Sequence, residues 1–286
     1  GTGIVIDPNG DVLTNNHGIE GATEITAVSL ANSRTYDVDV IGFDRASDIA
    51  LVRLRGAEAL PTAALGTSSS VAVGDPIAAI GNSDGAGGNP SYAPGSVTQL
   101  GASVRASDEA GGGARQLDDL IRVAADIRPG DSGGPLVNSA GQVVGVTVAA
   151  TLTYGLSGVR GGEGFAIPID RAMAIANQIR AGAPSPSIHL GDTAFIGVAI
   201  ADTPPFRGGP VGAVVRQALP DTPAQAAGLV SGDVITAVDG IPIGAAADLS
   251  NIMDQRRPGD TIVLSWIDRG GNPRSAPVVV TKGPVG

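Results

Sequence analysis

Short apolar segments separated by clusters of turn-forming residues make up residues 1–169 and constrain the fold most strongly. Residues 4–6 form one such segment, which the turn at 7–10 separates from the next at 12–13. Segments of this length indicate β-strands, and their number suits one or two barrels. A mainly β fold is therefore predicted. The further strand candidates are 25–30, 36–43, 49–54, 76–80, 96–101, 142–149 and 164–167.

A domain boundary is expected after residues 171–180, where apolar residues recur at the spacing of a helix. The following Pro- and Ser-rich stretch can neither continue a helix nor pair as a central strand. We expect a first domain over residues 1–181, a linker over 182–188 and a second domain over 189–286. The second domain is expected to be a compact α+β unit. Its strand candidates are 195–200, 211–217, 233–238 and 261–266, with a helix at 246–254.

The composition argues against several classes of protein. A net charge of −10, with 18 scattered basic residues, does not suit a nucleic-acid surface. The chain has no cysteine, so it has no disulfide or thiol nucleophile. No motif predicts a metal site or a cofactor. No apolar run is long enough to cross a bilayer, and no signal peptide or initiator Met is present, so we expect a mature or trimmed fragment.

Two histidines limit the search for a general base, because imidazole is the commonest group that exchanges protons near neutral pH. His189 directly follows the linker, where an exposed or packing role is favoured. His17 ends a strand candidate, which can present its side chain to a cleft. A histidine in this position is more often structural, so the remaining motifs decide its role.

The glycine-rich sequence around Ser132 points to nucleophilic catalysis. A serine hydroxyl needs a base to remove its proton, and the oxyanion that it creates needs fixed backbone N–H donors. Gly130 can adopt the backbone angles that direct its N–H beside that of Ser132. A simple glycine-rich turn is the alternative.

Asp48 opens an apolar strand candidate and could accept the Nδ1 proton of a catalytic histidine. Taken alone, it would be assigned to a turn. The chain order His17, Asp48, Ser132 is that of the chymotrypsin-type triad. These residues are therefore predicted as the catalytic triad of a serine peptidase.

These motifs together resemble the HtrA family of bacterial trypsin-like proteases. The resemblance implies a chymotrypsin-like double β-barrel, an endopeptidase acting on unfolded or misfolded polypeptides, and an extracytoplasmic location. It also implies that Gly164, Phe165 and Ala166 line the primary pocket and pair with the substrate backbone. The matching stretches are 1–6, 13–17, 48–52, 80–82, 130–136 and 164–168.

The second domain resembles a PDZ module, with residues 227–240 as its most regular stretch. By this resemblance, the loop Phe195, Ile196, Gly197 and Val198 would hold the carboxylate of a peptide C-terminus through its backbone N–H groups. The predicted helix carries apolar residues that could line the peptide groove or lie in the core. Ile252 at least is expected to be mainly core.

Three departures from the family pattern bear on these expectations. Gly18 follows His17 where the family has an aliphatic residue, and the strand and trimer-promoting segments that precede the family's first motif are absent from this sequence. Homo-oligomerisation is therefore an open expectation. Asp126, beside the pocket candidate Ile127, suggests tolerance for basic P1 residues, unless a nearby arginine pairs with it. A catalytically silent, peptide-binding chaperone or adaptor is the alternative function.

Overall fold

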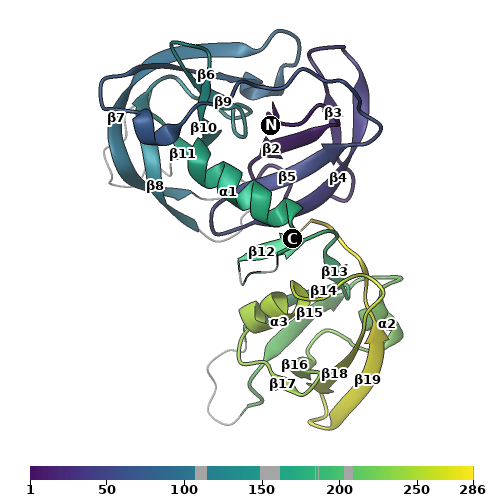
Figure 1. Cartoon of the computed structure of the whole chain (residues 1–286). Coiled ribbons are helices and arrows are strands. Elements are labelled where there is room, and N and C mark those ends of the chain that lie inside the picture. Colours follow the sequence, from purple (N-terminus) through teal and green to yellow (C-terminus); the bar gives the residue numbers. More distant parts are fainter. Residues whose placement is uncertain (107–114, 149–161, 184, 186, 203–208, 286) are drawn as a thin grey trace. The chain divides into compact units, whose positions relative to one another are not determined.

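The computed structural model describes residues 1–106, 115–148, 162–183, 185, 187–202 and 209–285. The chain divides into two compact units (Figure 1). The first unit comprises Gly1–Glu20 and Glu24–Leu190, and the second comprises Gly21–Thr23 and Gly191–Gly286. The division falls after Leu190 because strand β12 (Ile188–Leu190) pairs with β4 (Thr35–Asp44) of the first unit. In the expected linker, Pro184 and Pro186 lie outside the described residues.

One antiparallel sheet of the first unit has the strand order β1-β2-β5-β4-β12, with β3 paired to β4. The turn between its first two strands forms as expected, since Gly10 has a φ of 97° and its N–H donates to Asp7 O at 3.0 Å. The strands not yet bounded are β1 (Ile4–Val5), β2 (Asp11–Thr14), β3 (Thr26–Val28) and β5 (Ile49–Leu54).

The second sheet closes into a barrel in the order β10-β11-β8-β7-β6-β9. The sequence analysis contained no strand at β8, where the adjacent acidic residues Asp118 and Asp119 interrupt the apolar pattern. Short 3₁₀ helices occur at Ser68–Ser70 and Ser83–Gly85. The barrel strands are β6 (Pro76–Gly81), β7 (Ser91–Ala106), β8 (Arg115–Ala124), β9 (Pro135–Asn138), β10 (Val143–Val148) and β11 (Gly164–Pro168).

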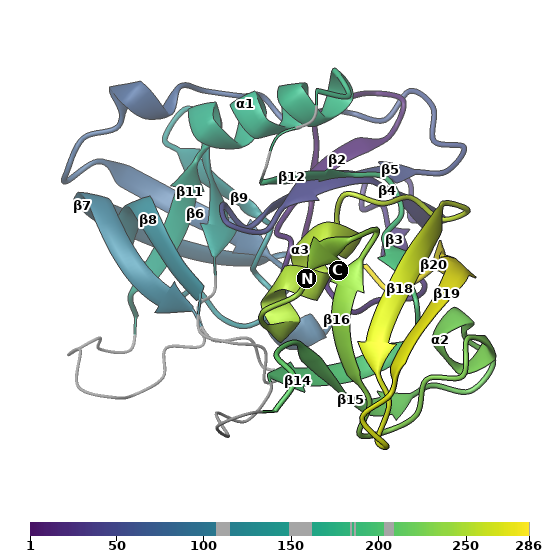
Figure 2. The ribbon, with the colours of Figure 1, turned by 90° about the horizontal axis from the view of Figure 1, so that it is seen from below.

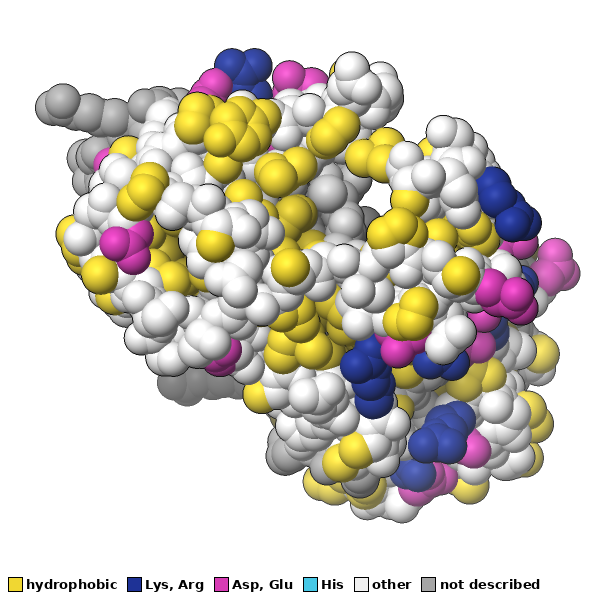
Figure 3. All heavy atoms as spheres, turned by 45° about the horizontal axis from the view of Figure 1, so that its top comes forward, with side chains coloured by type: hydrophobic (Ala, Val, Ile, Leu, Met, Phe, Trp, Pro, Cys, Tyr) yellow, Lys and Arg dark blue, Asp and Glu magenta, His cyan; other side chains and the backbone are white. Residues whose placement is uncertain are grey.

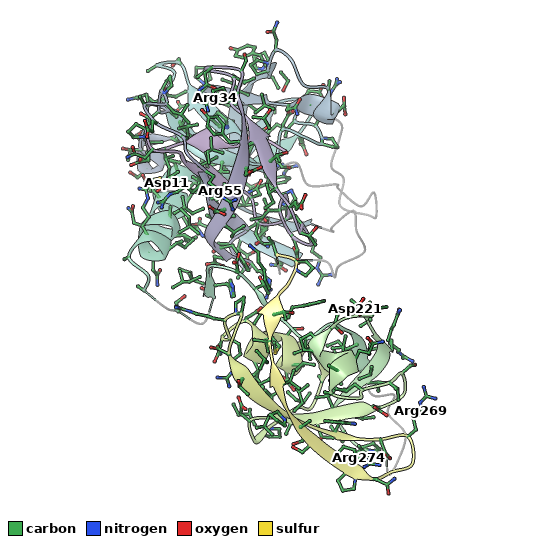
Figure 4. The ribbon with its side chains drawn as sticks, turned by 90° about the vertical axis from the view of Figure 1, so that its right-hand side faces the viewer. Asp11, Arg34, Arg55, Asp221, Arg269 and Arg274 are labelled. Atoms are coloured by element: carbon green, nitrogen blue, oxygen red, sulfur yellow. The ribbon has the colours of Figure 1, made fainter. Side chains whose placement is uncertain are left out.

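Helix α1 (Ile169–Arg180) contacts strands of both sheets, and Figure 1 shows it lying across them. Five of its residues are buried, and they join a core that also contains side chains from both sheets. The last turn of the helix is fixed by Arg180, whose Nε donates to the buried carboxylate of Asp11 at 2.8 Å. Arg53 Nε donates at 2.8 Å to the other oxygen of Asp11, the residue labelled in Figure 4. One carboxylate thus connects α1 to β2 and β5.

The second unit is an antiparallel sheet with two helices and its own apolar core. The strand order is β14-β15-β16-β18-β19, with β17 added to β16 and a separate β13-β20 pair. Figure 2 shows helices α2 and α3 on opposite sides of strands β16, β18 and β19. The elements are β13 (Ala194–Phe195), β14 (Val198–Asp202), β15 (Ala213–Ala218), α2 (Pro223–Ala226), β16 (Val234–Val238), β17 (Ile241–Pro242), α3 (Ala246–Met253), β18 (Thr261–Ile267), β19 (Pro273–Val279) and β20 (Thr281–Lys282).

The predicted fold class is confirmed: the chain is mainly β, with a six-stranded antiparallel sheet and a closed barrel in the first unit, followed by a small α+β domain. Basic and acidic side chains are mixed rather than gathered in patches of one sign, as Figure 3 shows for one face. The pairs Arg256–Asp239 and Arg274–Asp268, with N–O distances of 2.8 and 3.0 Å, are examples from the second unit.

Candidate active site

The structure brings His17 and Asp48 together. Nδ1 of His17 lies 2.7 Å from Oδ2 of Asp48, and the backbone N–H of His17 donates to Oδ1 at 2.9 Å. The Asp48 side chain is 3% exposed, whereas the His17 ring is 28% exposed and can meet a substrate from the solvent side. A buried carboxylate on Nδ1 fixes the tautomer in which Nε2 can accept a proton.

Asp48 adopts an unusual backbone conformation, with a φ of 54° in the left-handed region. Its carbonyl oxygen accepts a hydrogen bond of 2.9 Å from Nδ2 of the fully buried Asn15. The carboxylate therefore meets His17 while the backbone of the same residue is held by Asn15. The sequence indicated a turn residue or a catalytic residue at Asp48, and the structure shows a residue in turn conformation that contacts the histidine.

Ser132 is 8% exposed and lies in the turn that precedes β9. The next residue, Gly133, has a φ of 84°, and a Cβ built there would lie 2.3 Å from Thr14 Oγ1 and 3.2 Å from Asn15 N. Only glycine fits such an approach. The serine turn therefore packs directly against the two residues that precede Asn16 and His17 in the chain.

Gly130 has a φ of 95°, and an added Cβ would lie 2.1 Å from Asn82 O. Its carbonyl oxygen accepts the hydroxyl of Thr2 at 2.7 Å. Within the described residues, the N–H of Gly130 has no hydrogen-bond acceptor. A fixed, unpaired N–H two residues before a serine is what an oxyanion site requires.

Asp126 is not the buried acid that a basic P1 preference would require. Its side chain is 60% exposed, and Oδ2 accepts hydrogen bonds from Arg128 Nη2 at 2.6 Å and from Arg128 Nε at 2.9 Å. These bonds raise the pKa of the Arg128 guanidinium above its usual value. The alternative considered from the sequence, pairing with a nearby arginine, is the arrangement observed.

Ile127 contacts Gly164, because a Cβ built on Gly164 would lie 2.3 Å from Ile127 Cδ1. The expectation that Phe165 and Ala166 pair with a substrate backbone is wrong, since both already have partner residues on two strands. Phe165 pairs with Val148 of β10 and Arg122 of β8, and Ala166 is paired on the same two sides. β11 is an interior strand of a closed barrel and has no free edge there.

The other histidine, His189, is 6% exposed in β12, and its ring stacks on Phe43 with 4.8 Å between the ring centroids. This packing role agrees with the sequence interpretation. Within the described ranges, no group of three or more His, Cys, Asp and Glu side chains is placed to hold a metal ion. None of the described helices has the length and apolar character to span a membrane.

In the second unit, the predicted carboxylate loop joins β13 to the edge strand β14. Gly197 has a φ of 82°, and its carbonyl oxygen accepts the N–H of Leu219 at 2.8 Å. Among the residues that the structure describes, the N–H groups of Ile196 and Gly197 have no acceptor. The loop thus offers two adjacent donors beside the strand at the edge of the described sheet.

Helix α3 carries apolar residues that lie in the core of the second unit or pack against it. Leu249 and Met253 are 2% and 7% exposed and belong to the core, whereas Ile252 is only partly buried. As expected, Ile252 packs against this core, with part of its side chain left exposed. Val198 and Ile200 of β14 are likewise partly buried against the same core. The partly exposed apolar side chains of β14 and α3 are those available to a ligand.

Comparisons with known proteins agree with these two units. Residues 1–146 match the model of the trypsin-like peptidase domain, and residues 194–280 match the model of the PDZ domain. The structure of the HtrA-type protease AlgW with a decapeptide is similar, with 28% identity and a TM-score of 0.54, over 99% of this chain and 82% of that one. The chain belongs to the HtrA family of trypsin-like serine proteases. For this HtrA protein, the similarity extends across both units.

Curated relatives of this HtrA chain carry names of the same kind. The putative serine protease HhoA of Synechocystis is 37% identical over 265 residues, which cover 89% of this chain and 64% of the relative. The serine protease PepD of Mycobacterium tuberculosis is 35% identical over 294 residues, 99% of this chain and 61% of the relative. The chain therefore spans less than two thirds of the length of these relatives.

Sequence reasoning missed the role of Thr2 in this HtrA chain, although Thr2 lies in a matched motif. Its N–H donates to Ser132 O at 2.9 Å, its hydroxyl donates to Gly130 O, and its carbonyl oxygen accepts the hydroxyl of Thr14 at 2.7 Å. Thr2 thus connects the strand that leads to His17 with both ends of the Gly130–Ser132 turn. Nothing in the sequence pattern distinguishes this threonine from a surface residue.

Proposed function

We propose that this chain is a serine endopeptidase that uses Ser132 as nucleophile, His17 as general base and Asp48 as the carboxylate that orients His17. The observation that carries the proposal is the double contact of Asp48 with His17, beside a serine turn that packs on Thr14 and Asn15. The chemistry requires no cofactor.

In the proposed reaction, Ser132 Oγ attacks the carbonyl carbon of a peptide bond and His17 Nε2 takes the hydroxyl proton. The N–H groups of Gly130 and Ser132 donate to the oxyanion of the tetrahedral intermediate. His17 then gives the proton to the leaving amine, which departs and leaves an acyl-enzyme. Water attacks the ester with His17 again as base, and the released Ser132 hydroxyl regains its proton.

The proposed substrates are unfolded or misfolded polypeptides, and the proposed ligands of the second unit are peptide C-termini. The N–H groups of Ile196 and Gly197, which have no acceptor among the described residues, support carboxylate binding, and the edge strand β14 supports addition of a peptide strand. Relatives named as periplasmic in Pseudomonas savastanoi and chloroplastic in Arabidopsis thaliana support an extracytoplasmic location. Assembly into homo-oligomers is part of the proposal.

Labelling with a fluorophosphonate probe and hydrolysis of casein test the activity together. We expect labelling of the folded wild-type chain at Ser132 and loss of both labelling and hydrolysis in Ser132→Ala. Casein hydrolysis that survives Ser132→Ala would refute the assignment of the nucleophile. Suppression of aggregation without labelling or turnover by the wild type would favour the silent chaperone or adaptor instead.

A further inference from the structure

The carboxylate of Asp131, between Gly130 and Ser132, is held by serine hydroxyls. Asp131 is 1% exposed. Ser91 Oγ donates to Oδ1 at 2.6 Å, and Ser83 Oγ lies 2.8 Å from Oδ1 and 2.9 Å from Oδ2. The backbone N–H of Arg128 donates to Oδ2 at 3.0 Å. Short O–H···O distances are typical of hydroxyls that donate to an ionised carboxylate.

Burial of a carboxylate is costly unless its charge is compensated. Within the described residues, no Lys, Arg or N-terminal nitrogen forms an ion pair with Asp131, and the nearby Arg128 side chain is bonded to Asp126. The compensation is supplied by hydrogen bonds, and two of the three donor groups are the hydroxyls of Ser83 and Ser91. Loss of either hydroxyl leaves a buried charge with fewer partners, which favours movement of Asp131 out of its site.

The segment that carries these serines also packs on the backbone of the catalytic turn. Asp84 N donates to Pro129 O at 2.7 Å, and a Cβ on Gly81 would lie 2.5 Å from Asp131 Oδ1. The close approach of Asn82 O to Gly130 belongs to the same contact. The segment formed by residues 81–91 therefore fixes both the side chain and the backbone of the turn.

We propose that Ser83 and Ser91 are positioning residues that hold Asp131, and through it keep the N–H groups of Gly130 and Ser132 directed at the oxyanion. This inference rests on the proposed function. Neither serine touches the substrate. Because they act through the transition-state donors, their loss is expected to lower kcat and leave KM unchanged.

The test uses Ser83→Ala, Ser91→Ala and the double variant in the full chain. Ser70→Ala is the matched control, since Ser70 is an exposed serine whose hydroxyl donates only to Thr67 O in its own turn. Ser91→Thr keeps the hydroxyl and serves as the rescue variant. Turnover is measured with an internally quenched peptide that has an amidated C-terminus, so that the PDZ domain has no carboxylate to bind.

We expect kcat to fall about tenfold in each single variant and about a hundredfold in the double variant, with KM within about twofold. Ser91→Thr and Ser70→Ala should stay within about twofold of wild type. Hydrogen exchange of the peptide containing Gly130 and Ser132 should be faster in the alanine variants and unchanged in Ser70→Ala.

An active wild type with unchanged kcat and unchanged exchange in the double variant would overturn the inference. An inactive wild type would refute the proposed function instead. In that case the exchange experiment still decides the inference: faster exchange in the alanine variants supports the anchoring of the turn, and unchanged exchange refutes it. A fall in kcat that Ser91→Thr shares, with normal exchange, would also count against the hydroxyl contact.

Discussion

Both carboxylate oxygens of Asp48 contact one residue, His17: Oδ2 meets the ring at 2.7 Å and Oδ1 meets the backbone N–H at 2.9 Å. The second contact fixes the carboxylate relative to the main chain of the histidine, so ring and carboxylate cannot drift apart through rotation of one side chain. The orientation of the base is therefore a property of the backbone at the end of β2.

Asp48→Asn should lower kcat by about 10⁴ with little change in folding, because an amide of the same shape cannot hold the required tautomer. Steady-state hydrolysis of a peptide ester or amide substrate gives the kcat values to compare. Asp37→Asn, at an exposed aspartate, is the control and should be neutral. Wild-type turnover by Asp48→Asn would exclude the proposed role.

Ile127→Ala should widen the primary (P1) pocket that the family resemblance implies beside Gly164, because Ile127 Cδ1 lies close to Gly164. The ratio of kcat/KM for Leu or Phe at P1 over Val at P1 should rise about tenfold. Asp126→Ala should leave the ratio for Arg over Val unchanged, because its carboxylate is exposed and bonded to Arg128. A loss of cleavage after Arg in Asp126→Ala would show that Asp126 does recognise basic P1 residues.

Gly18→Ala should raise the free energy of unfolding by about 0.4–1 kcal/mol, because the substitution restricts the unfolded chain. Gly18 has no positive φ, and an added Cβ would meet only Asn15 O, at 3.6 Å. Chemical denaturation gives the comparison. Gly74→Ala, at a φ of 96°, should be destabilising instead. A destabilised Gly18→Ala variant would show that the space beside His17 is not open.

Gly197→Ala should weaken binding of a fluorescent peptide with a free C-terminus by more than tenfold, since the new Cβ would lie 2.2 Å from Thr222 Cβ. Fluorescence anisotropy measures the affinity, with the C-terminally amidated peptide as ligand control. Gly240→Ala is the matched variant: its φ of 78° is similar, but nothing lies within 4 Å of the added atom. Equal affinities in the two variants would contradict the loop assignment.

Acid should destabilise the second unit through Asp268. The N–H of Asn272, then Arg274 and further donors, lower the pKa of this carboxyl below its usual value. Such a group stabilises the fold above its unfolded pKa of about 3.9, and the contribution is lost as the pH falls through the lower folded pKa. Trp266, the one tryptophan of the chain, is buried in this unit and reports its unfolding.

The free energy of unfolding, monitored at Trp266, should therefore fall less between about pH 5 and pH 3 in Asp268→Asn than in wild type. Asp221→Asn is the control, at an exposed aspartate whose backbone N–H donates to Gln225. A wild-type acid dependence that Asp268→Asn retains in full would assign the effect to other carboxyls.

The local sequence pattern predicted the elements that are strongly apolar or that depend mainly on contacts within the element. The strand 49–54 has the predicted bounds, and α1 begins only two residues before the expected start at Arg171. β8 was missed because Asp118 and Asp119 interrupt its apolar pattern, whereas the structure pairs it with two neighbouring strands of the closed barrel. Within the site, residue types and chain order predicted the His17–Asp48 contact, since the chemistry demands those groups.

The features that the sequence did not predict depend on contacts between side chains, and the sequence does not show which side chains meet. Asp126 was placed in a pocket because nothing in a sequence reveals whether the side chain two residues on will pair with it. The hydroxyl contacts of Thr2 and of Ser91 reach across 128 and 40 residues to the catalytic turn.

The pairing of β12 with β4 matters when the protease unit is produced without the second unit. Residues Ile188–Leu190 satisfy the hydrogen-bonding edge of Gly42–Asp44. A protease unit that ends at 181 would expose that row of unpaired peptide groups, and an exposed strand edge is a template for pairing with another molecule. The three residues that precede the second unit thus cover this strand edge of the protease unit.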